Sequence, residues 1–183
     1  MSAARPVCFT VDCDALGEHH GVWGLPAPSP DAAARFWLEG VAAAHAFLQE
    51  RNIPATFFVI GSRVPDAGRK LLQKIATVHE IGNHTWTHPW DLTRMEEASV
   101  MQELARNHEF LTEIGAAPCG FRSPGYHLPP QAAQSLIHLG YRYSSSQLTG
   151  ILYPLAKKIA SIGLRLRGRR TRTVEHPWTD AFT

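Results

Sequence analysis

The chain has 183 residues, 44% of them hydrophobic, a length and composition that predict one globular domain with a substantial core. It shows no apolar signal segment at its N-terminus and no run of the roughly 18 apolar residues that a membrane span needs. Its formal net charge is +2. Its three cysteines are too scattered for a disulfide framework, which favours a reducing compartment, so we expect a cytoplasmic protein.

The first predicted strand covers residues 6–12, where β-branched and apolar residues lead to an acid and favour a buried strand. Asp12 and Asp14 follow at a spacing of two, so both carboxylates should leave the strand by the same face. Two acids at the end of an apolar strand are costly unless a metal or hydrogen bonds satisfy them. The alternative interpretation is a turn-forming pair of acids that merely ends the strand.

Residues 15–30 are rich in Gly and Pro and predict a loop, which could contact a substrate because it follows a candidate site. A helix should begin at an N-cap on Ser29 and run to about Arg51. Further strands are predicted at 53–61, 80–83, 119–122 and 141–145. Three more helices are predicted: the first at 66–77, the second from a capping box at 93–96 to residue 114, and the third from Pro129 or Pro130 to His138. This alternation predicts an α/β fold with a parallel sheet or barrel and a site at the carboxyl ends of its strands.

The motif His84-Thr85-Trp86-Thr87-His88 follows the predicted strand 80–83. Its two imidazoles lie four residues apart, so they share one face of a helical turn or close over a bend between strand and loop. In either arrangement they can bind one cation and leave part of its coordination sphere open. Such a pair is weak evidence for a metal site by itself. A strand-end carboxylate near the N-terminus supplies the third candidate ligand.

Three motifs in this order resemble the polysaccharide deacetylase family of the NodB-homology type, similar to carbohydrate esterase family 4. Residues 10–14 resemble its first motif, residues 84–88 its second and residues 122–126 its third, while residues 140–146 resemble its fourth strand signature. The resemblance covers residues 7 to about 146. It implies a distorted (β/α) barrel with fewer than eight strands.

The resemblance also implies one divalent metal held by one Asp and two His. Carried over by position, Asp14, His84 and His88 are the metal ligands and Asp12 is the catalytic base. The commonest pattern in the family has adjacent acids, whereas Cys13 separates them here, so the roles of Asp12 and Asp14 could be exchanged. Zinc is the first choice of metal, and cobalt, manganese or iron would also suit this set of ligands.

The third motif implies the rest of the catalytic site. Arg122 should pair with Asp12 and keep it ionised and correctly aimed. Pro124, Gly125 and Tyr126 should contact the substrate, with the backbone N–H of Tyr126 stabilising the oxyanion. The alternative interpretation of this motif is a surface turn.

Positive charge gathers in the last third of the chain. Residues 114–174 hold nine Lys or Arg and no acid. Within them, residues 151–172 form a basic amphipathic insertion, which predicts a helix on an anionic membrane surface or a cradle for an anionic, lipid-linked sugar. A helix packed on the barrel with its charges in water is the competing interpretation. Residues 173–177 predict another inner strand.

We expect residues 1–183 to form a single NodB-like domain that is truncated at its C-terminus. In the family a further strand and a His that serves as general acid normally follow, and no counterpart follows Thr183. We therefore expect slow amide hydrolysis by these residues alone. His127 and His176 are the nearest replacements for the general acid.

The function expected from the resemblance is a metal-dependent hydrolase that removes an N-acetyl or N-formyl group from an amino sugar in a polysaccharide or glycolipid. One alternative is an amidohydrolase or deformylase that acts on a small amide other than a sugar. Another is a catalytically inactive metal-binding module. We expect no nucleic-acid partner.

Overall fold

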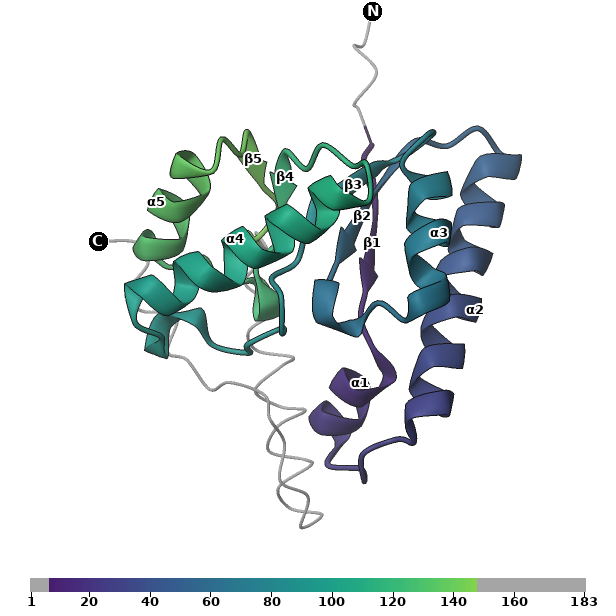
Figure 1. The fold of residues 1–183 in the computed structure, drawn as a ribbon, viewed down its shortest axis with the longest axis horizontal. Coiled ribbons are helices and arrows are strands. Elements are labelled where there is room, and N and C mark those ends of the chain that lie inside the picture. The colour runs from purple at the N-terminus through teal and green to yellow at the C-terminus, as the bar shows by residue number, and fades with distance from the viewer. Residues whose placement is uncertain (1–6, 148–183) are drawn as a thin grey trace, which may run out of the picture.

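The computed structural model describes residues 7–147, which form a parallel sheet flanked by helices (Figure 1). The strands are β1 (Phe9–Cys13), β2 (Ala55–Val59), β3 (Glu80–Asn83), β4 (Gly120–Phe121) and β5 (Tyr143–Ser144). They lie side by side in chain order and all pairs are parallel. This confirms the α/β prediction, and within residues 7–147 the sheet stays open rather than closing into a barrel.

Helices connect the strands and cover the sheet. They are α1 (Leu16–Trp23), α2 (Pro30–Glu50), α3 (Asp66–Ile75), α4 (Glu97–Glu113) and α5 (Pro130–His138), with short 3₁₀ turns η1 (Gly61–Arg63), η2 (Leu92–Arg94) and η3 (Pro124–Tyr126). Figure 1 shows α2 and α3 together on the flank of β1 and β2, and α4 with α5 on the flank of β4 and β5. In the described part of the chain no helix is both long and apolar enough to cross a membrane.

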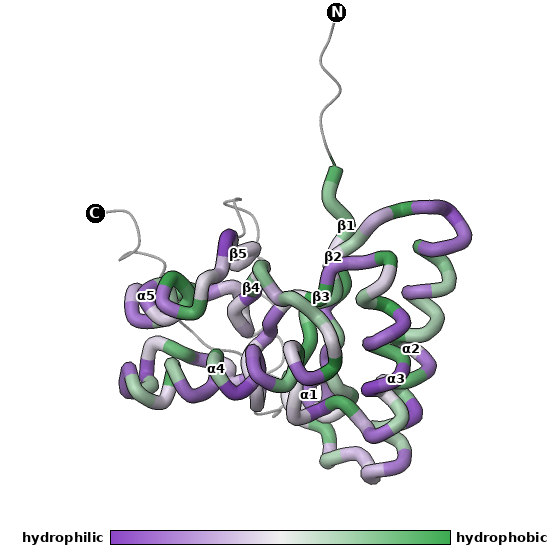
Figure 2. The backbone as a smooth tube through the Cα atoms, turned by 45° about the horizontal axis from the view of Figure 1, so that its top comes forward, coloured by the Kyte–Doolittle hydropathy of each residue, from purple (hydrophilic) through white to green (hydrophobic). Residues whose placement is uncertain are grey.

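The core is centred on β2, which is buried along most of its length. Phe57 and Phe58 are fully buried, and Phe57 packs in a cluster with Trp37 of α2 and Leu72 of α3. Burying each such large apolar side chain is worth about 1.5–3 kcal/mol. Hydrophobic residues run along the central strands in Figure 2, whereas the flanking helices alternate between polar and apolar positions. The buried apolar side chains of the central strands therefore hold in place the strands that carry the predicted site residues.

The strand register places the site residues in one row. Cys13 pairs with Val59, Val59 with Asn83, Asn83 with Phe121 and Phe121 with Ser144. Residues 14, 84 and 122 each lie one position beyond this row, at the carboxyl ends of parallel strands. The predicted site residues therefore meet at one edge of the sheet because the register is in phase across it.

The prediction of a loop over residues 15–30 is wrong in its first half, where α1 forms. Gly17, Gly21 and Gly24 suggested a break, but only Gly24 ends the helix, with a left-handed backbone at φ 63°. Its amide donates back to carbonyls of the last turn, which satisfies groups that a helix end leaves free. The helix has no side-chain N-cap, so the usual start signal is missing.

Two further predictions need correction. The capping box at 93–96 does not form, because the N–H and hydroxyl of Thr93 both donate to Asp91 Oδ1, and α4 instead begins after Glu96. The strand predicted to be buried, β1, is only partly covered, and Phe9 is 47% exposed. Within residues 7–147 β1 pairs with β2 alone, so its other edge has no strand beside it.

Several predictions fall outside the described residues. These are the basic insertion at 151–172, the inner strand at 173–177 and His176. The single-domain boundary at 1–183 stays a prediction for the same reason.

Two histidines that the predicted chemistry does not use lie buried together. His45 of α2 and His79, just before β3, pack edge to face with ring centroids 5.4 Å apart, and His79 also contacts Phe57. Among residues 7–147, neither ring nitrogen of either residue has a hydrogen-bond partner. Burial lowers the pKa of both rings, and for His45 the charges of His79 and Lys74 lower it further.

This pair should make the protein sensitive to acid. In the unfolded chain these rings become protonated as the pH falls below about 6.5, whereas in the folded chain they stay neutral to a lower pH because burial lowers their pKa. Each ring should therefore lower the free energy of unfolding by about 1.4 kcal/mol per pH unit until its folded pKa is reached. Urea unfolding of chelator-treated protein between pH 7.5 and 5 measures this slope, with the pH limits chosen to bracket the usual His pKa of about 6.5.

The matched variants are His45→Leu with His79→Leu, and the exposed His138→Leu as control. The double variant should flatten the slope and the control should leave it unchanged. A double variant as acid-sensitive as the wild type would contradict the prediction.

Candidate metal centre

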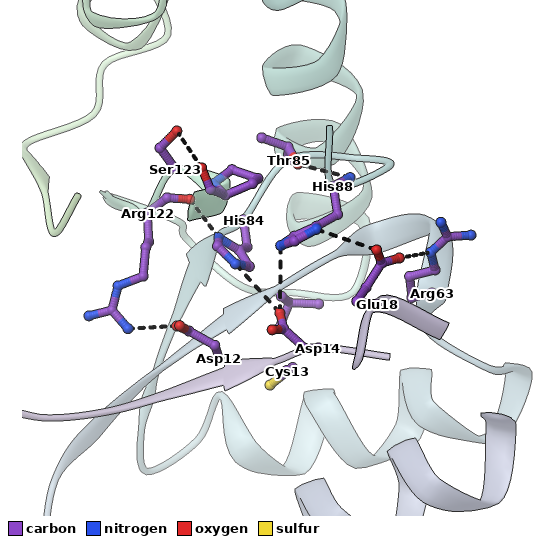
Figure 3. A network of polar contacts seen from close by, with 12 residues as sticks. Asp12, Cys13, Asp14, Glu18, Arg63, His84, Thr85, His88, Arg122 and Ser123 are labelled. Atoms are coloured by element: carbon purple, nitrogen blue, oxygen red, sulfur yellow. Dashed lines mark hydrogen bonds and ion pairs between the residues drawn. The ribbon is translucent and has the colours of Figure 1, made fainter. Parts of the chain in front are cut away.

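Three side chains from two strand ends converge on one point (Figure 3). Ligand atoms of Asp14, His84 and His88 all lie within 4.8 Å of one another. Asp14 Oδ1 is 3.6 Å from Nε2 of His84 and 3.8 Å from Nε2 of His88. Asp12 leaves β1 on the same side as Asp14 while Cys13 points the opposite way, as the spacing of two predicted. Burial raises the pKa of the Cys13 thiol, which belongs to the core.

The two metal-ligand candidates of the second motif lie in a bent loop, the second of the two predicted arrangements. Thr85 and His88 have left-handed backbones, with φ of 67° and 61°. Such conformations are costly for residues other than Gly and persist where surrounding contacts enforce them. Here the N–H of Thr85 donates to Asn83 Oδ1 at 2.8 Å, and the N–H of His88 donates to Thr85 Oγ1 at 3.1 Å.

Asn83, at the end of β3, fixes this loop from below. Its side chain is fully buried and donates to the carbonyl of Leu104 at 3.0 Å and to the hydroxyl of Tyr141 at 2.7 Å. Its Oδ1 also accepts from the amide of Asn107 at 2.8 Å. A buried network of this kind is stable only while each member is satisfied.

Replacing Asn83 by alanine should therefore destabilise the fold markedly. The change leaves several buried donors and acceptors without partners, at about 1–3 kcal/mol for each group left unsatisfied. We expect a total loss of about 2–4 kcal/mol in the free energy of unfolding, measured by urea denaturation of the metal-free protein. Gln73→Ala, an exposed position on α3, is the control; a loss no larger than that of the control would contradict this role.

Glu103 of α4 secures the middle of the loop from the other side. Its Oε2 accepts from the backbone N–H groups of Trp86 and Thr87 at 3.0 and 2.8 Å, and its Oε1 accepts from the hydroxyl of Thr87 at 2.8 Å. No sequence pattern indicates this role, because an acid in the middle of a helix is usually an ordinary surface residue.

Arg122 links the candidate base to one of the candidate ligands. Its Nη1 donates to Asp12 Oδ1 at 2.6 Å, so the predicted pair is present, while its own carbonyl lies 2.6 Å from His84 Nδ1. Its Nε donates to the carbonyl of Ser145, and its Nη2 donates to Ser145 Oγ and to Thr10 Oγ1. A guanidinium held at so many points has little freedom to turn, so Asp12 is held in one place.

Tyr126 contacts Asp12 through its side-chain hydroxyl, whereas the prediction concerned its backbone N–H as the donor to the oxyanion. Its hydroxyl donates to Asp12 Oδ2 at 3.1 Å, while its backbone N–H donates to the carbonyl of Ser123 at 3.0 Å. Gly125 and Tyr126 both have left-handed backbones, which turn the chain sharply after Pro124. The proposed oxyanion donor is therefore already used within its turn, and its catalytic role stays a prediction.

Glu18 of α1 is the acid that sequence reasoning missed. It is only 6% exposed; its Oε1 accepts from Nε of Arg63 at 3.0 Å, and its Oε2 is 3.6 Å from His88 Nδ1 (Figure 3). Burial raises the pKa of Glu18, but contact with His88 and Arg63 outweighs it and the net shift is downward. No motif could reveal this residue, because α1 itself was predicted as a loop.

The set of donors fits a divalent cation. Asp14 Oδ1 is buried and has no hydrogen-bond partner in the described part of the chain, since 3.6 Å to His84 is too long for a hydrogen bond. An oxygen in this state is costly unless something positive satisfies it. Burial raises the pKa of Asp14, and the proximity of His84, His88 and His19 lowers it overall, so this acid is poised as a carboxylate. One carboxylate and two imidazoles make a common three-ligand site with an open position.

The geometry also separates the two acids. Asp14 faces both imidazoles, whereas Asp12 faces Arg122 and Tyr126. This arrangement favours Asp14 as the ligand and Asp12 as the base over the exchanged assignment. His127, a candidate general acid, is exposed, and its carbonyl accepts a hydrogen bond from the hydroxyl of Ser123.

Comparison with known proteins identifies relatives. The family model described as polysaccharide deacetylase matches residues 35–144. A chitin deacetylase of Cryptococcus neoformans is 38% identical over 79 residues, which cover 43% of this chain and 17% of that protein. A peptidoglycan deacetylase of Helicobacter pylori is 26% identical over 146 residues, which cover 76% of this chain and 48% of that protein.

A solved structure shares the fold. The chitin deacetylase from the fungal pathogen Colletotrichum lindemuthianum superimposes with a TM-score of 0.55 at 20% identity, covering 75% of this chain and 54% of that one. The chain thus spans about half or less of the length of these curated relatives.

Proposed function

The chain belongs to the polysaccharide deacetylase family, and from that premise we propose that it is a metal-dependent hydrolase acting on carbon–nitrogen bonds other than peptide bonds. It removes an N-acetyl or N-formyl group from an amino sugar in a polysaccharide or glycolipid. The relatives named above, a chitin deacetylase and a peptidoglycan deacetylase, support this class of substrate.

One observation carries the proposal. A three-ligand cluster and a separate carboxylate pinned by an arginine lie side by side at the carboxyl edge of one parallel sheet. A metal centre alone needs only Asp14, His84 and His88. The second carboxylate, Asp12, and its fixed partner Arg122 add a proton acceptor next to the metal centre, which is what hydrolysis requires.

Asp14, His84 and His88 would hold the divalent metal, with zinc as our first choice. A metal bound there supplies Lewis acidity that polarises the amide carbonyl, and lowers the pKa of water from about 15.7 to about 7. His84 presents Nε2 toward Asp14 because its Nδ1 is engaged with the carbonyl of Arg122 at 2.6 Å. That hydrogen bond leaves the Nε2 lone pair for a cation.

Asp12 takes a proton from water as the water adds to the amide carbonyl. Both of its oxygens already accept one hydrogen bond, Oδ1 from Arg122 and Oδ2 from Tyr126, and each keeps a lone pair for the incoming proton. These two donors aim the carboxylate and limit its rotation. Holding a base in its reactive position removes part of the entropic cost of the reaction.

Release of acetate tests the proposal. The metal-loaded chain is incubated with N-acetylated chitin oligomers, with formylated amino sugars and with small amides, and acetate and formate are measured. We expect acetate release that a chelator abolishes. Formate release alone, or activity on small amides alone, would favour the alternative amidohydrolase, and metal binding without any turnover would favour an inactive metal-binding module.

A further inference from the structure

The two candidate imidazole ligands are held by different kinds of acceptor. His84 Nδ1 contacts a backbone carbonyl, that of Arg122, at 2.6 Å. His88 Nδ1 instead faces a carboxylate, Oε2 of Glu18, at 3.6 Å. Figure 3 shows Glu18 between His88 and Arg63, on the opposite side of His88 from Asp14.

His88 needs such an acceptor if its Nε2 is to bind a cation. A neutral imidazole can offer the Nε2 lone pair only when its proton is on Nδ1, and a buried N–H without an acceptor is costly. The His88 Nδ1 is buried and has no hydrogen-bond partner within the described residues, and Glu18 is the acid that the structure pairs with it. A shortening of about 0.5 Å would turn this contact into a hydrogen bond.

Glu18 is itself held in place. Its side chain is buried, and Arg63 of η1 donates to its other oxygen at 3.0 Å. Taking a carboxylate out of water is costly, and one partly exposed arginine recovers only part of that cost. A second partner, the Nδ1–H of His88, accounts for the burial.

We propose that Glu18 is a positioning residue of the metal centre, which accepts a hydrogen bond from His88 Nδ1–H and so directs the Nε2 lone pair of His88 toward the cation. The proposal rests on the metal centre of the proposed function but not on its substrate. Carboxylates in this position typically strengthen metal binding by 10–100-fold.

The simplest competing role is structural, in which Glu18 and Arg63 only fasten α1 to η1. Cobalt titration distinguishes the two, because the visible absorption of bound Co²⁺ reports both affinity and the geometry of the ligands. Glu18→Gln keeps the shape of the side chain and removes the charge. We expect it to weaken Co²⁺ binding by about 10–100-fold and to change the spectrum.

Arg63→Met and the exposed Glu50→Gln are the matched variants. Arg63 contacts Glu18 and not His88, so its loss should weaken Co²⁺ binding much less than Glu18→Gln, and Glu50→Gln should have no effect. Wild-type affinity and spectrum in Glu18→Gln would overturn the proposal. Equal losses in Glu18→Gln and Arg63→Met would also overturn it, because they point to the ion pair alone.

If Glu18→Gln does not fold, the titration of Glu18→Asp decides. Its shorter carboxylate keeps the charge but retreats from His88, so weaker Co²⁺ binding supports positioning and unchanged binding overturns it. Deacetylation is not needed for either titration. A wild type that binds Co²⁺ normally but releases no acetate would therefore defeat the proposed function and leave the role of Glu18 intact.

Discussion

Replacing His84 by alanine should leave the protein without its divalent metal. The change removes one of three ligands and also the hydrogen bond between His84 Nδ1 and the carbonyl of Arg122. Losing an outer partner of a ligand typically costs 10–100-fold in affinity, so losing the ligand itself should cost more than about 100-fold. Elemental analysis after dialysis should find about one equivalent in the wild type and none in the variant.

His138→Ala is the control for this experiment, since His138 is an exposed residue at the end of α5. It should retain the metal content of the wild type. Equal metal in His84→Ala and wild type would mean that the cation is held elsewhere, and the site described here would be wrong.

Replacing Asp12 by asparagine should keep the metal and remove most of the activity. The amide oxygen can still accept from Arg122, and the amide NH2 can donate to the hydroxyl of Tyr126, so the local packing survives, but the amide cannot take a proton from water. Removing a general base typically costs on the order of 10²–10⁴-fold in rate. The turnover of N-acetylated chitin oligomers and the metal content should be measured on the same preparation.

Asp31→Asn, at the exposed start of α2, is the matched control and should change neither quantity. The exchanged assignment predicts the opposite pattern. If Asp12→Asn lost the metal while Asp14→Asn kept it, Asp12 would be the ligand and Asp14 the base.

The positions of the predicted site residues followed from sequence because each lies at the carboxyl end of a strand or in the loop that follows it. The alternation of strand and helix signals along the sequence located β1, β3 and β4. Parallel strands bring their carboxyl ends to one edge of the sheet. The pairing of Arg122 with Asp12 was predicted from the resemblance of residues 122–126 to the third family motif, and the structure contains this contact. Their chemical roles stay predictions.

The supporting contacts could not be predicted, since they depend on tertiary packing. Glu18 lies on α1, which the sequence predicted to be a loop because of its glycines. Glu103 of α4 accepts hydrogen bonds from the loop 84–88, which is distant from it in sequence. The left-handed backbones at Thr85 and His88 depend on Asn83. Asn83 is in turn held in place by distant residues, namely Leu104, Asn107 and Tyr141. Such constraints arise from residues far apart in sequence, and no local pattern encodes them.

The most direct test of the metal centre is a crystal structure of the zinc-loaded protein with anomalous scattering data at the zinc edge. We expect one strong peak about 2.0–2.2 Å from a carboxylate oxygen of Asp14 and from Nε2 of His84 and of His88. The same map should show Asp12 outside the coordination shell and still paired with Arg122. A peak elsewhere, or no peak between these three side chains in fully loaded crystals, would contradict the account.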